Sequence, residues 1–600
     1  MEQSSLSTPA QILHDVFGYT SFRPGQEEIV DLILKGENLL AVMPTGSGKS
    51  LCYQIPALIF ERPTIVVSPL TALMDDQVAG LRADGVEAAA IHSGQSRETQ
   101  VAEWRKVTSG KTKLLYLSPE RLMLDNMLAA IDRLDPALFV IDEAHCISKW
   151  GPSFRPEYEQ LTRLQQLFPG ARIAAFTATA DKATRADIAA KLFKGQGQII
   201  LHGFDRPNLR LAVAQKTQWS KQLLAFLADK KGQAGIVYCL SRKFTDEVAD
   251  FLKEQGFNAI PYHAGQEAEL RKRNQDRFMS EEAVVMVATI AFGMGIDKPD
   301  IRYVCHLNLP GSMEAYYQEI GRAGRDGLPA ETLLLYGLDD MRMRRMFIEE
   351  DGTDEEHKLR ERKRLDALIS YCEATQCRRV ALLGYFDEET QPCGNCDNCL
   401  NPPVTIDATR QAQMLLSAIH RTGQAFGAGH VIDVLLGADT EKIRARGHEN
   451  LPTYGVGKDF PKSYWQSVVR QAVAGGQIAI NVAKYGCLEI TERGRAILKG
   501  EAQFAFREPG KKSARATRRA AADAADLPEV DHALLARLKE LRLSLARARQ
   551  VPAYVVFPDA TLIEMARRRP GSLDEMAEIS GVGARKLAQF GPAFLDVTRS

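Results

Sequence analysis

Two short segments, each associated with an apolar run, restrict the possible folds of this chain more than any other feature. Residues 43–50 read Met-Pro-Thr-Gly-Ser-Gly-Lys-Ser and follow the apolar run 39–42. A glycine-rich loop between a strand and a helix lets backbone N–H groups surround phosphates. Residues 138–145 read Leu-Phe-Val-Ile-Asp-Glu-Ala-His, a second apolar run that ends on two carboxylates. Together the segments predict an α/β chain that binds and hydrolyses a nucleoside triphosphate.

The residue types suggest a role for each position of this predicted site. Lys49 supplies positive charge to the phosphates, Ser50 and Asp142 are placed to hold Mg²⁺, and Glu143 to polarise the attacking water. Met43 stands where the usual pattern begins with glycine, and Pro-Thr-Gly follows it to shape the turn. The phosphate-surrounding residues of the loop are Thr45, Gly46, Ser47, Gly48, Lys49 and Ser50.

A third segment supplies arginines. Residues 321–327 read Gly-Arg-Ala-Gly-Arg-Asp-Gly, which places Arg322 and Arg325 three residues apart, on one face of an expected helix. An arginine that reaches the transferring phosphoryl group raises the rate by about 10³- to 10⁵-fold in related chemistry. Residues 177–180, Thr-Ala-Thr-Ala, add hydroxyls beside the carboxylates. They are expected to relay the nucleotide state, or alternatively to cap the next helix.

The net charge and the apolar stretches of the chain bear on nucleic-acid binding and on membrane insertion. The 76 basic and 76 acidic residues cancel, so any nucleic-acid binding must depend on local patches. The chain starts without a basic and apolar leader and contains no uncharged apolar stretch of about 18 residues. We therefore expect a cytoplasmic protein that does not contact the membrane.

The order of apolar runs predicts the domain organisation. From about residue 10 to 340, short apolar runs alternate with helical stretches, which predicts parallel sheets with helices on both faces. A motif-free gap near 195–230 divides this region into two lobes. The expected units are lobe 1 (1–205), lobe 2 (206–340), a zinc-binding unit (341–402), a winged helix (403–503), a basic linker (504–526) and a small helical domain (527–600). Helices followed by a hairpin, two β-like runs about a tight turn at residues 476–490, suggest the winged helix. A segment rich in Ala, Lys and Arg suggests the linker.

Four of the ten cysteines lie between residues 377 and 399. Their spacing is C-x₁₅-C-x₂-C-x₂-C, with a Gly-Asn turn between the second and third, and it predicts one tetrahedral zinc ion. An iron–sulfur cluster or a pair of disulfides are the alternatives. The predicted ligands are Cys377, Cys393, Cys396 and Cys399, with Cys372 as an alternative first ligand.

The ordered motifs resemble those of superfamily 2 helicases, and specifically the RecQ family. The motifs are residues 22–26, 43–50, 142–145, 177–180, 287–297 and 318–327, and the resemblance covers nearly the whole chain. Its most specific marks are the residues 142–158, the four-cysteine cluster, the winged helix and the C-terminal helical domain, in that order. The resemblance implies two RecA-like lobes, an all-α HRDC-like C-terminal domain, and a bacterial-type DNA helicase that moves 3′ to 5′ with ATP, Mg²⁺ and Zn²⁺. Recombination, repair and replication-fork processing are the processes it implies.

The resemblance also assigns individual residues. Tyr19 is expected to stack on adenine while Arg23 and Gln26 read its edge, and His145 and Gln318 join the catalytic set. It favours Cys377 over Cys372 as the first zinc ligand. Single-stranded DNA is expected on Trp150, Phe154, Arg155 and Tyr158, whose rings offer stacking of about 1–3 kcal/mol per base, and on Tyr554. These aromatic residues could instead be a small hydrophobic cluster and the core of a helical bundle.

The sequence also suggests binding partners and leaves two alternative functions open. We expect single-stranded and duplex DNA as partners, a monomer associated with the nucleoid, and a contact of Arg495 and Lys499 with the tail of a single-stranded DNA-binding protein. An RNA-remodelling ATPase stays open, because Asp-Glu-Ala-His also occurs in RNA helicases and no motif reads the 2′-OH. A DNA-binding scaffold with a degenerate ATPase is the non-enzymatic alternative.

Overall fold

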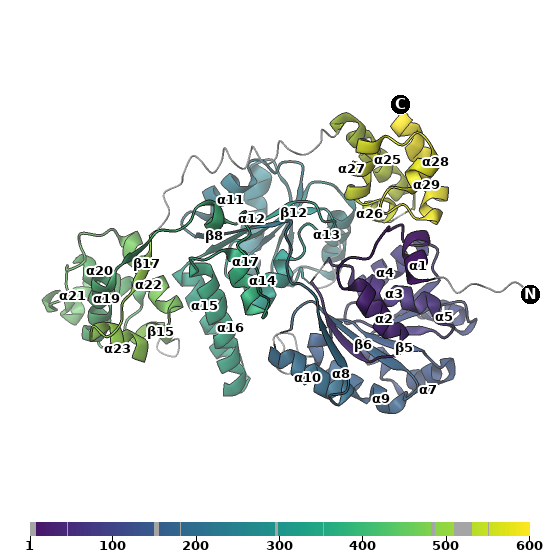
Figure 1. The fold of residues 1–600 in the computed structure, drawn as a ribbon. Coiled ribbons are helices and arrows are strands. Elements are labelled where there is room, and N and C mark those ends of the chain that lie inside the picture. Colours follow the sequence, from purple (N-terminus) through teal and green to yellow (C-terminus); the bar gives the residue numbers. More distant parts are fainter. Residues whose placement is uncertain are drawn as a thin grey trace, which may run out of the picture.

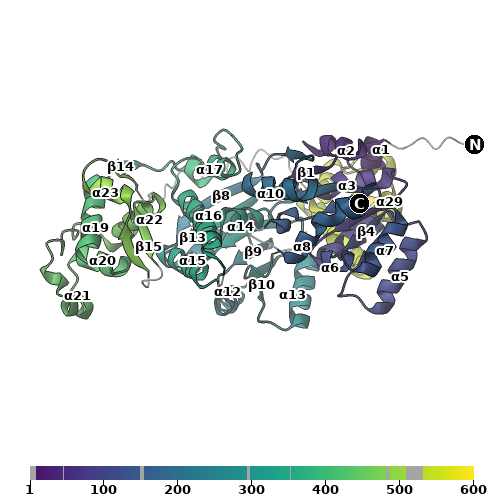
Figure 2. The ribbon, with the colours of Figure 1, turned by 90° about the horizontal axis from the view of Figure 1, so that it is seen from below.

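The computed structural model describes residues 8–44, 46–148, 155–180, 182–293, 298–351, 353–481, 486–508, 531–549 and 551–599. The units follow one another along an elongated molecule, with the winged helix at one end and lobe 1 at the other (Figure 1). The C-terminal helices return to lie beside lobe 1 in both views (Figures 1 and 2).

Lobe 1 is built on a parallel sheet in the order β3-β4-β2-β5-β6-β1-β7. Most of its strands are short runs of Leu, Ile, Val and Ala that are buried throughout, as expected when helices cover both faces. The strands are β1 (Leu39–Val42), β2 (Thr64–Val67), β3 (Ala88–Ile91), β4 (Leu114–Leu117), β5 (Leu138–Ile141), β6 (Arg172–Thr177) and β7 (Gln198–Leu201). The main helices are α1 (Pro9–Asp15), α2 (Gln26–Leu34), α3 (Lys49–Ile59), α4 (Thr71–Ala83), α5 (Arg97–Thr108), α6 (Pro119–Leu122), α7 (Asp125–Leu134), α8 (Pro156–Glu159), α9 (Leu164–Leu167) and α10 (Lys182–Phe193).

Lobe 2 repeats this architecture with a parallel sheet in the order β10-β11-β9-β12-β13-β8. The sequence did not indicate strands β3, β7, β8, β10 and β13; β7, at the edge of the lobe 1 sheet, and β8, at the edge of the lobe 2 sheet, lie in the motif-free gap. The strands are β8 (Leu209–Gln215), β9 (Ala234–Tyr238), β10 (Asn258–Tyr262), β11 (Val284–Ala288), β12 (Ile301–His306) and β13 (Ala330–Tyr336), and the helices α11 (Trp219–Leu227), α12 (Arg242–Glu254), α13 (Ala268–Ser280) and α14 (Met313–Ile320). The prediction of two α/β lobes is confirmed.

A helical unit follows lobe 2. Its two long helices carry charges of both signs that pair between them: Arg362 lies 2.6 Å from Glu349, and Arg345 lies 2.5 Å from Asp366. The unit consists of α15 (Leu338–Glu350), α16 (Glu355–Glu373), α17 (Arg378–Tyr385) and α18 (Asp397–Leu400).

The winged helix extends further than the sequence predicted. Strand β17 (Ala505–Arg507) pairs antiparallel with β14 (Thr405–Asp407), and Phe506 is fully buried, so the unit continues past residue 503 and the linker begins later than 504. Residues 509–530, most of the predicted linker, lie outside the described residues. The expected hairpin forms from β15 (Ile478–Asn481) and β16 (Cys487–Ile490). The helices are α19 (Thr409–Arg421), α20 (Ala428–Leu436), α21 (Glu441–Arg446), α22 (Lys462–Ala474) and α23 (Glu492–Leu498).

The C-terminal domain is a helical bundle around Phe557, Phe590 and Phe594. Its helices are α25 (His532–Arg549), α26 (Ala553–Val556), α27 (Asp559–Arg568), α28 (Leu573–Ala577) and α29 (Ala584–Arg599). Across the described part of the chain, none of the helices combines the length and apolarity needed to cross a membrane.

Candidate nucleotide and metal sites

The loop between β1 and α3 has the geometry of a phosphate-binding loop. Gly46 and Gly48 both have φ +81°, a left-handed conformation that side chains rarely adopt, and α3 begins at Lys49. Gln26 donates hydrogen bonds to the carbonyls of Ser47 and Gly48, at 3.0 and 3.1 Å. The start of α2 therefore holds the loop in place; Thr45 lies outside the described residues.

Two carboxylates face this loop from the end of β5. Asp142 accepts a hydrogen bond of 2.9 Å from the N–H of Glu143. Glu143 itself has φ 49°, a strained conformation of the kind that clusters at functional sites. His145 is buried and lies 3.3 Å from the Glu143 carboxylate. Lys49 acts on both carboxylates electrostatically.

Burial and charge shift the two carboxyl pKa values in opposite directions. Burial and the neighbouring Glu143 charge raise the pKa of Asp142 to about 7, although Lys49 opposes this. Burial also acts to raise the pKa of Glu143, but the hydrogen bond and charge of His145 and the charge of Lys49 outweigh it and lower that pKa to about 2. Two adjacent buried carboxylates thus resist carrying two charges, and a divalent cation at Asp142 would favour the ionised form.

A chain of polar contacts leads from these carboxylates to lobe 2. His145 Nδ1 lies 2.9 Å from Thr177 Oγ1, and the Thr177 hydroxyl accepts from the N–H of Thr179 at 3.3 Å. Gln318, on α14, donates to the Thr179 hydroxyl at 3.2 Å. The predicted catalytic residues His145 and Gln318 are therefore joined through the segment 177–180.

The arginine segment is a turn, not a helix, which corrects the expected helical placement. Helix α14 ends at Ile320, and Gly324 has φ +58°, so the chain turns instead of continuing the helix. Arg322 is 7 % exposed and acts electrostatically on Glu143. The Cγ of Arg325 lies 3.2 Å from the position that a Cβ on Gly46 would occupy. This arginine loop of lobe 2 (residues 321–325) thus contacts the phosphate loop of lobe 1.

A cleft of about 370 Å³ lies between the lobes at this contact. The predicted adenine-binding residues line it together with the catalytic ones. From lobe 1 the lining includes Tyr19, Arg23, Gln26, Gly46, Gly48, Lys49, Ser50, Asp142, Glu143 and His145, and from lobe 2 Gln318, Arg322 and Arg325. Arg23 also donates to the carbonyl of Gly46 at 2.5 Å.

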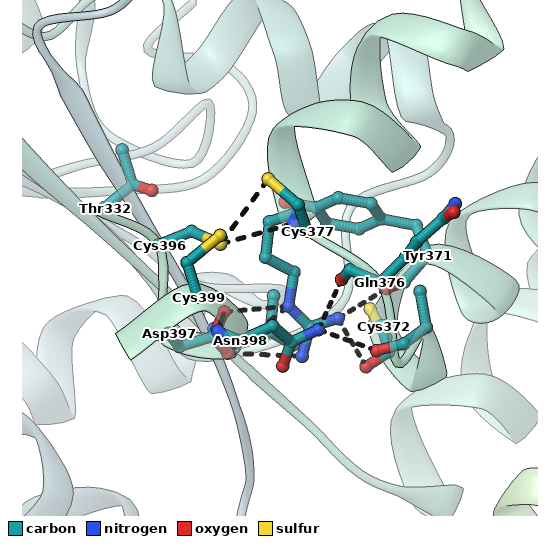
Figure 3. Close-up of polar contacts among 12 residues, drawn as sticks. Thr332, Tyr371, Cys372, Gln376, Cys377, Cys396, Asp397, Asn398 and Cys399 are labelled. Atoms are coloured by element: carbon teal, nitrogen blue, oxygen red, sulfur yellow. Dashed lines mark hydrogen bonds and ion pairs between the residues drawn. The ribbon is translucent and has the colours of Figure 1, made fainter. Parts of the chain in front are cut away.

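The four predicted cysteines meet in the helical unit. Their sulfur atoms all lie within 4.8 Å of one another; Cys377 is 3.5 Å from Cys393 and 3.8 Å from Cys396. Ligands about 2.3 Å from a tetrahedral zinc ion are about 3.8 Å apart, so the set fits zinc. Figure 3 shows the sulfurs of Cys377, Cys396 and Cys399 turned toward one another. Cys372, the alternative first ligand, is not part of the cluster.

Comparison with known proteins shows which families this chain resembles. Five family models match consecutive parts of the chain: DEAD/DEAH box helicase (23–188), helicase conserved C-terminal domain (215–327), RecQ zinc-binding (338–400), RQC domain (402–515) and HRDC domain (531–598). The ATP-dependent DNA helicase RecQ of Haemophilus influenzae is 45 % identical over 98 % of this chain and 95 % of that protein. The chain belongs to the RecQ family of ATP-dependent DNA helicases.

Two further relatives support this assignment. The ATP-dependent DNA helicase RecQ of Pasteurella multocida is 44 % identical over 98 % of this chain and 93 % of its own length. That of Bacillus subtilis is 39 % identical over 97 % of each chain. ATP, Mg²⁺ and Zn²⁺ are accordingly the cofactors, and the alternative of an RNA-remodelling ATPase is not favoured.

The aromatic loop expected to bind single-stranded DNA in this RecQ chain is described only in part. Trp150 and Phe154 lie outside the described residues. Tyr158 is fully buried, and its hydroxyl donates to the carbonyl of Asp142 at 3.1 Å. Its ring cannot offer a face to a base, so the expected DNA contact of Tyr158 is wrong; the residue supports the carboxylate strand instead. Arg155 is half-buried, and its N–H donates to the carbonyl of Cys146 at 3.0 Å.

The HRDC domain of this RecQ protein lies over the cleft and touches both lobes. The N–H of Gly581 donates to the carbonyl of Gly18, at 2.9 Å, beside Tyr19. Lys586 pairs with Asp84 of lobe 1 at 3.0 Å, and Arg542 pairs with Glu282 of lobe 2 at 3.1 Å. Nothing in the sequence indicated this docking. Tyr554 and Pro558 line the nucleotide cleft, and the expected DNA contact of Tyr554 stays a prediction.

Proposed function

We propose that this helicase moves along single-stranded DNA in the 3′ to 5′ direction and separates duplexes at its winged helix. One observation carries the proposal: the groups needed for ATP hydrolysis come from two lobes and meet in one cleft. Binding and release of nucleotide can therefore change how the lobes sit against each other, which is what movement along a strand requires.

Each group has a chemical task in this proposal. Lys49 and the backbone N–H groups of the phosphate loop bind the phosphates, and Glu143 orients the attacking water. Arg322 and Arg325 stabilise the charge that develops on the transferring phosphoryl group. Ser50 and Asp142 would hold Mg²⁺, which neutralises phosphate charge when bound.

Adenine recognition involves the N-terminal segment of lobe 1. Tyr19 lines the cleft, where its ring can stack on the base. Gln26 already donates to the phosphate loop and accepts the N–H of Arg23 at 2.8 Å. Binding of the adenine edge to Arg23 and Gln26 would therefore act on the phosphate loop through these hydrogen bonds.

The remaining assignments concern partners. Single-stranded DNA binds to Trp150, Phe154 and Arg155, which follow the carboxylate strand in the sequence. The acidic tail of a single-stranded DNA-binding protein binds to Arg495 and Lys499. The protein works as a cytoplasmic monomer, without membrane contact, on DNA in recombination, repair or replication-fork processing.

Unwinding of matched duplexes tests activity and direction together. Duplexes with a 3′ or a 5′ single-stranded overhang are incubated with and without ATP, and strand separation is measured. We expect ATP-dependent separation of the 3′-overhang duplex only, and none with Lys49→Ala, which should still bind DNA. Separation of the 5′-overhang duplex alone would contradict the polarity. Stronger stimulation of ATP hydrolysis by RNA than by DNA of the same sequence would contradict the substrate.

A further inference from the structure

The segment that joins the lobes, Phe204 to Asn208, contacts the arginine loop. Arg206 donates through Nη2 to the carbonyls of Ala323 and Gly324, at 2.9 and 2.8 Å, and through Nη1 to that of Gly321, at 3.3 Å. Asn208 adds a bond of 2.9 Å to the same Gly324 carbonyl. Carbonyls beyond the end of a helix have no partner within it, so a planar guanidinium with several donors suits them.

Arg206 also lies against the phosphate loop. A Cβ on Gly46 would be 3.2 Å from Arg206 Nη1 and 3.2 Å from Arg325 Cγ. Arg206 and Arg325 therefore pack against the same glycine. Burial, together with the positive charges of Arg325 and Arg23, lowers the pKa of Arg206 to about 10. Arg206, Arg325 and Arg23 thus place positive charge beside the phosphate loop, where a polyanion would bind. The N–H donors of Arg206 bond to the arginine loop.

The joining segment is itself fixed by the zinc-binding unit. Arg379, two residues after the zinc ligand Cys377, donates to Asp205 at 2.8 Å and to the carbonyl of Leu209 at 2.6 Å. The rings of Phe204 and Phe386 stack with centroids 4.6 Å apart. The Phe204 N–H donates to Glu388. Both flanks of Arg206 are therefore anchored outside the lobes.

We infer that Arg206 is a positioning residue of the ATP site, which sets the arginine loop against the phosphate loop and is itself held in place by the zinc-binding unit. The inference rests on the proposed roles of Arg322 and Arg325. Arg206 does not need to touch ATP, because its donors are directed to backbone carbonyls of the loop that carries those two arginines. Its effect should therefore appear in the chemical step and not in nucleotide binding.

The test compares R206Q and R206K with a matched control, R210Q. Arg210 lies in the next strand, and its pairing with Glu331 is partly exposed, at 3.5 Å. We expect R206Q to lower the DNA-stimulated kcat by roughly 10- to 100-fold, the scale of a small misplacement of catalytic groups. R206K should fall between R206Q and wild type, since one ammonium cannot reach all the carbonyls. R210Q should behave as wild type.

Binding measurements separate positioning from a general structural role. R206Q should bind ADP with aluminium fluoride, a mimic of the transferring phosphoryl group, more weakly by the same factor as its kcat. It should keep its affinity for a non-hydrolysable ATP analogue and for single-stranded DNA. R379Q should lower kcat in the same direction while retaining zinc.

Defined results would overturn the inference. One is a kcat for R206Q within about twofold of wild type. The other is an equal loss of kcat, analogue binding and DNA binding, which would make Arg206 a residue of general stability. A wild-type protein without DNA-stimulated hydrolysis would instead contradict the proposed function.

Discussion

Gln318 of lobe 2 donates a hydrogen bond of 3.2 Å to the Thr179 hydroxyl of lobe 1. Thr179 in turn bonds to Thr177, whose hydroxyl lies 2.9 Å from His145. The bond therefore joins α14, just before the arginine loop, to the residues around Glu143.

Removal of this bond should slow hydrolysis without weakening nucleotide binding. Gln318→Met keeps the shape of the side chain but has no donor. A net hydrogen bond contributes about 1 kcal/mol, so we expect roughly a fivefold lower DNA-stimulated kcat. Thr179→Val should have the same effect and Thr179→Ser little effect, as measured by phosphate release. If the double variant Gln318→Met/Thr179→Val is much slower than either single variant, the two residues act separately.

Docking of the HRDC domain should depend on the pairing of Lys586 with Asp84, whose side chains are 15 % and 17 % exposed. Lys586→Glu places two carboxylates together, so we expect the domain to leave the cleft more often. Hydrogen exchange at the amide of Gly581, which bonds to Gly18, should then become faster. Arg567→Glu makes the same charge change at an exposed position of α27 and is the control. Unchanged exchange in Lys586→Glu would show that other contacts hold the domain.

Loss of one zinc ligand should unfold the zinc-binding unit. Binding of a structural zinc ion contributes on the order of 10 kcal/mol to folding, and Cys396 is a fully buried member of the cluster. Cys396→Ser should therefore reduce the bound zinc and increase proteolysis near residues 370–400. Cys372→Ser, at a buried cysteine outside the cluster, should keep its zinc. Equal zinc content in the two variants, measured by mass spectrometry, would contradict the assignment.

The winged helix should lose stability in mild acid. His430 Nε2 lies 2.8 Å from His448 Nδ1, and the Phe426 ring stacks on His430 with centroids 4.1 Å apart. Burial and the charges of His448 and Lys442 lower the pKa of His430 from 6.5 to about 4. Between pH 6.5 and about 4, His430 is therefore protonated in the unfolded state but neutral in the folded state. The free energy of unfolding accordingly falls as the pH drops through this range.

Hydrogen exchange along α20, corrected for intrinsic rates, can measure this loss. Protection should decrease between pH 6.5 and 5 in the wild type. The decrease should be smaller in His430→Phe, which cannot be protonated. An equal decrease in both proteins would show that other groups titrate.

Trp150 should couple DNA binding to hydrolysis. Trp150→Ala removes a ring on which bases can stack, at about 1–3 kcal/mol per base. We expect basal ATP hydrolysis to persist while its stimulation by single-stranded DNA is lost. Trp150→Phe, which keeps an aromatic face, should retain most of the stimulation. Unchanged stimulation in Trp150→Ala would refute the role.

The features that could be predicted from the sequence have their chemistry in contiguous residues. The phosphate loop, Asp142 with Glu143 and the cysteine spacing each need only a short segment at the end of a strand or helix, so their residue types were sufficient. The alternation of apolar runs likewise predicted both sheets, because parallel strands are buried on both faces. Strands β7 and β8 were missed because the gap that contains them carries no motif, and β3, β10 and β13 were not indicated either.

Other features depend on contacts between distant segments. Tyr158 has the composition of a stacking residue, but packing in lobe 1 leaves its ring no access to solvent. Arg206 resembles any linker arginine until the fold brings Gly321, Ala323 and Gly324 to it. The HRDC domain covers the cleft through Lys586, and that position depends on the approach of residues hundreds of positions apart. Local residue types encode which chemistry is present, so that part of the site could be inferred from the amino-acid order. Which groups reach one another depends on long-range packing, because the folded chain sets those distances.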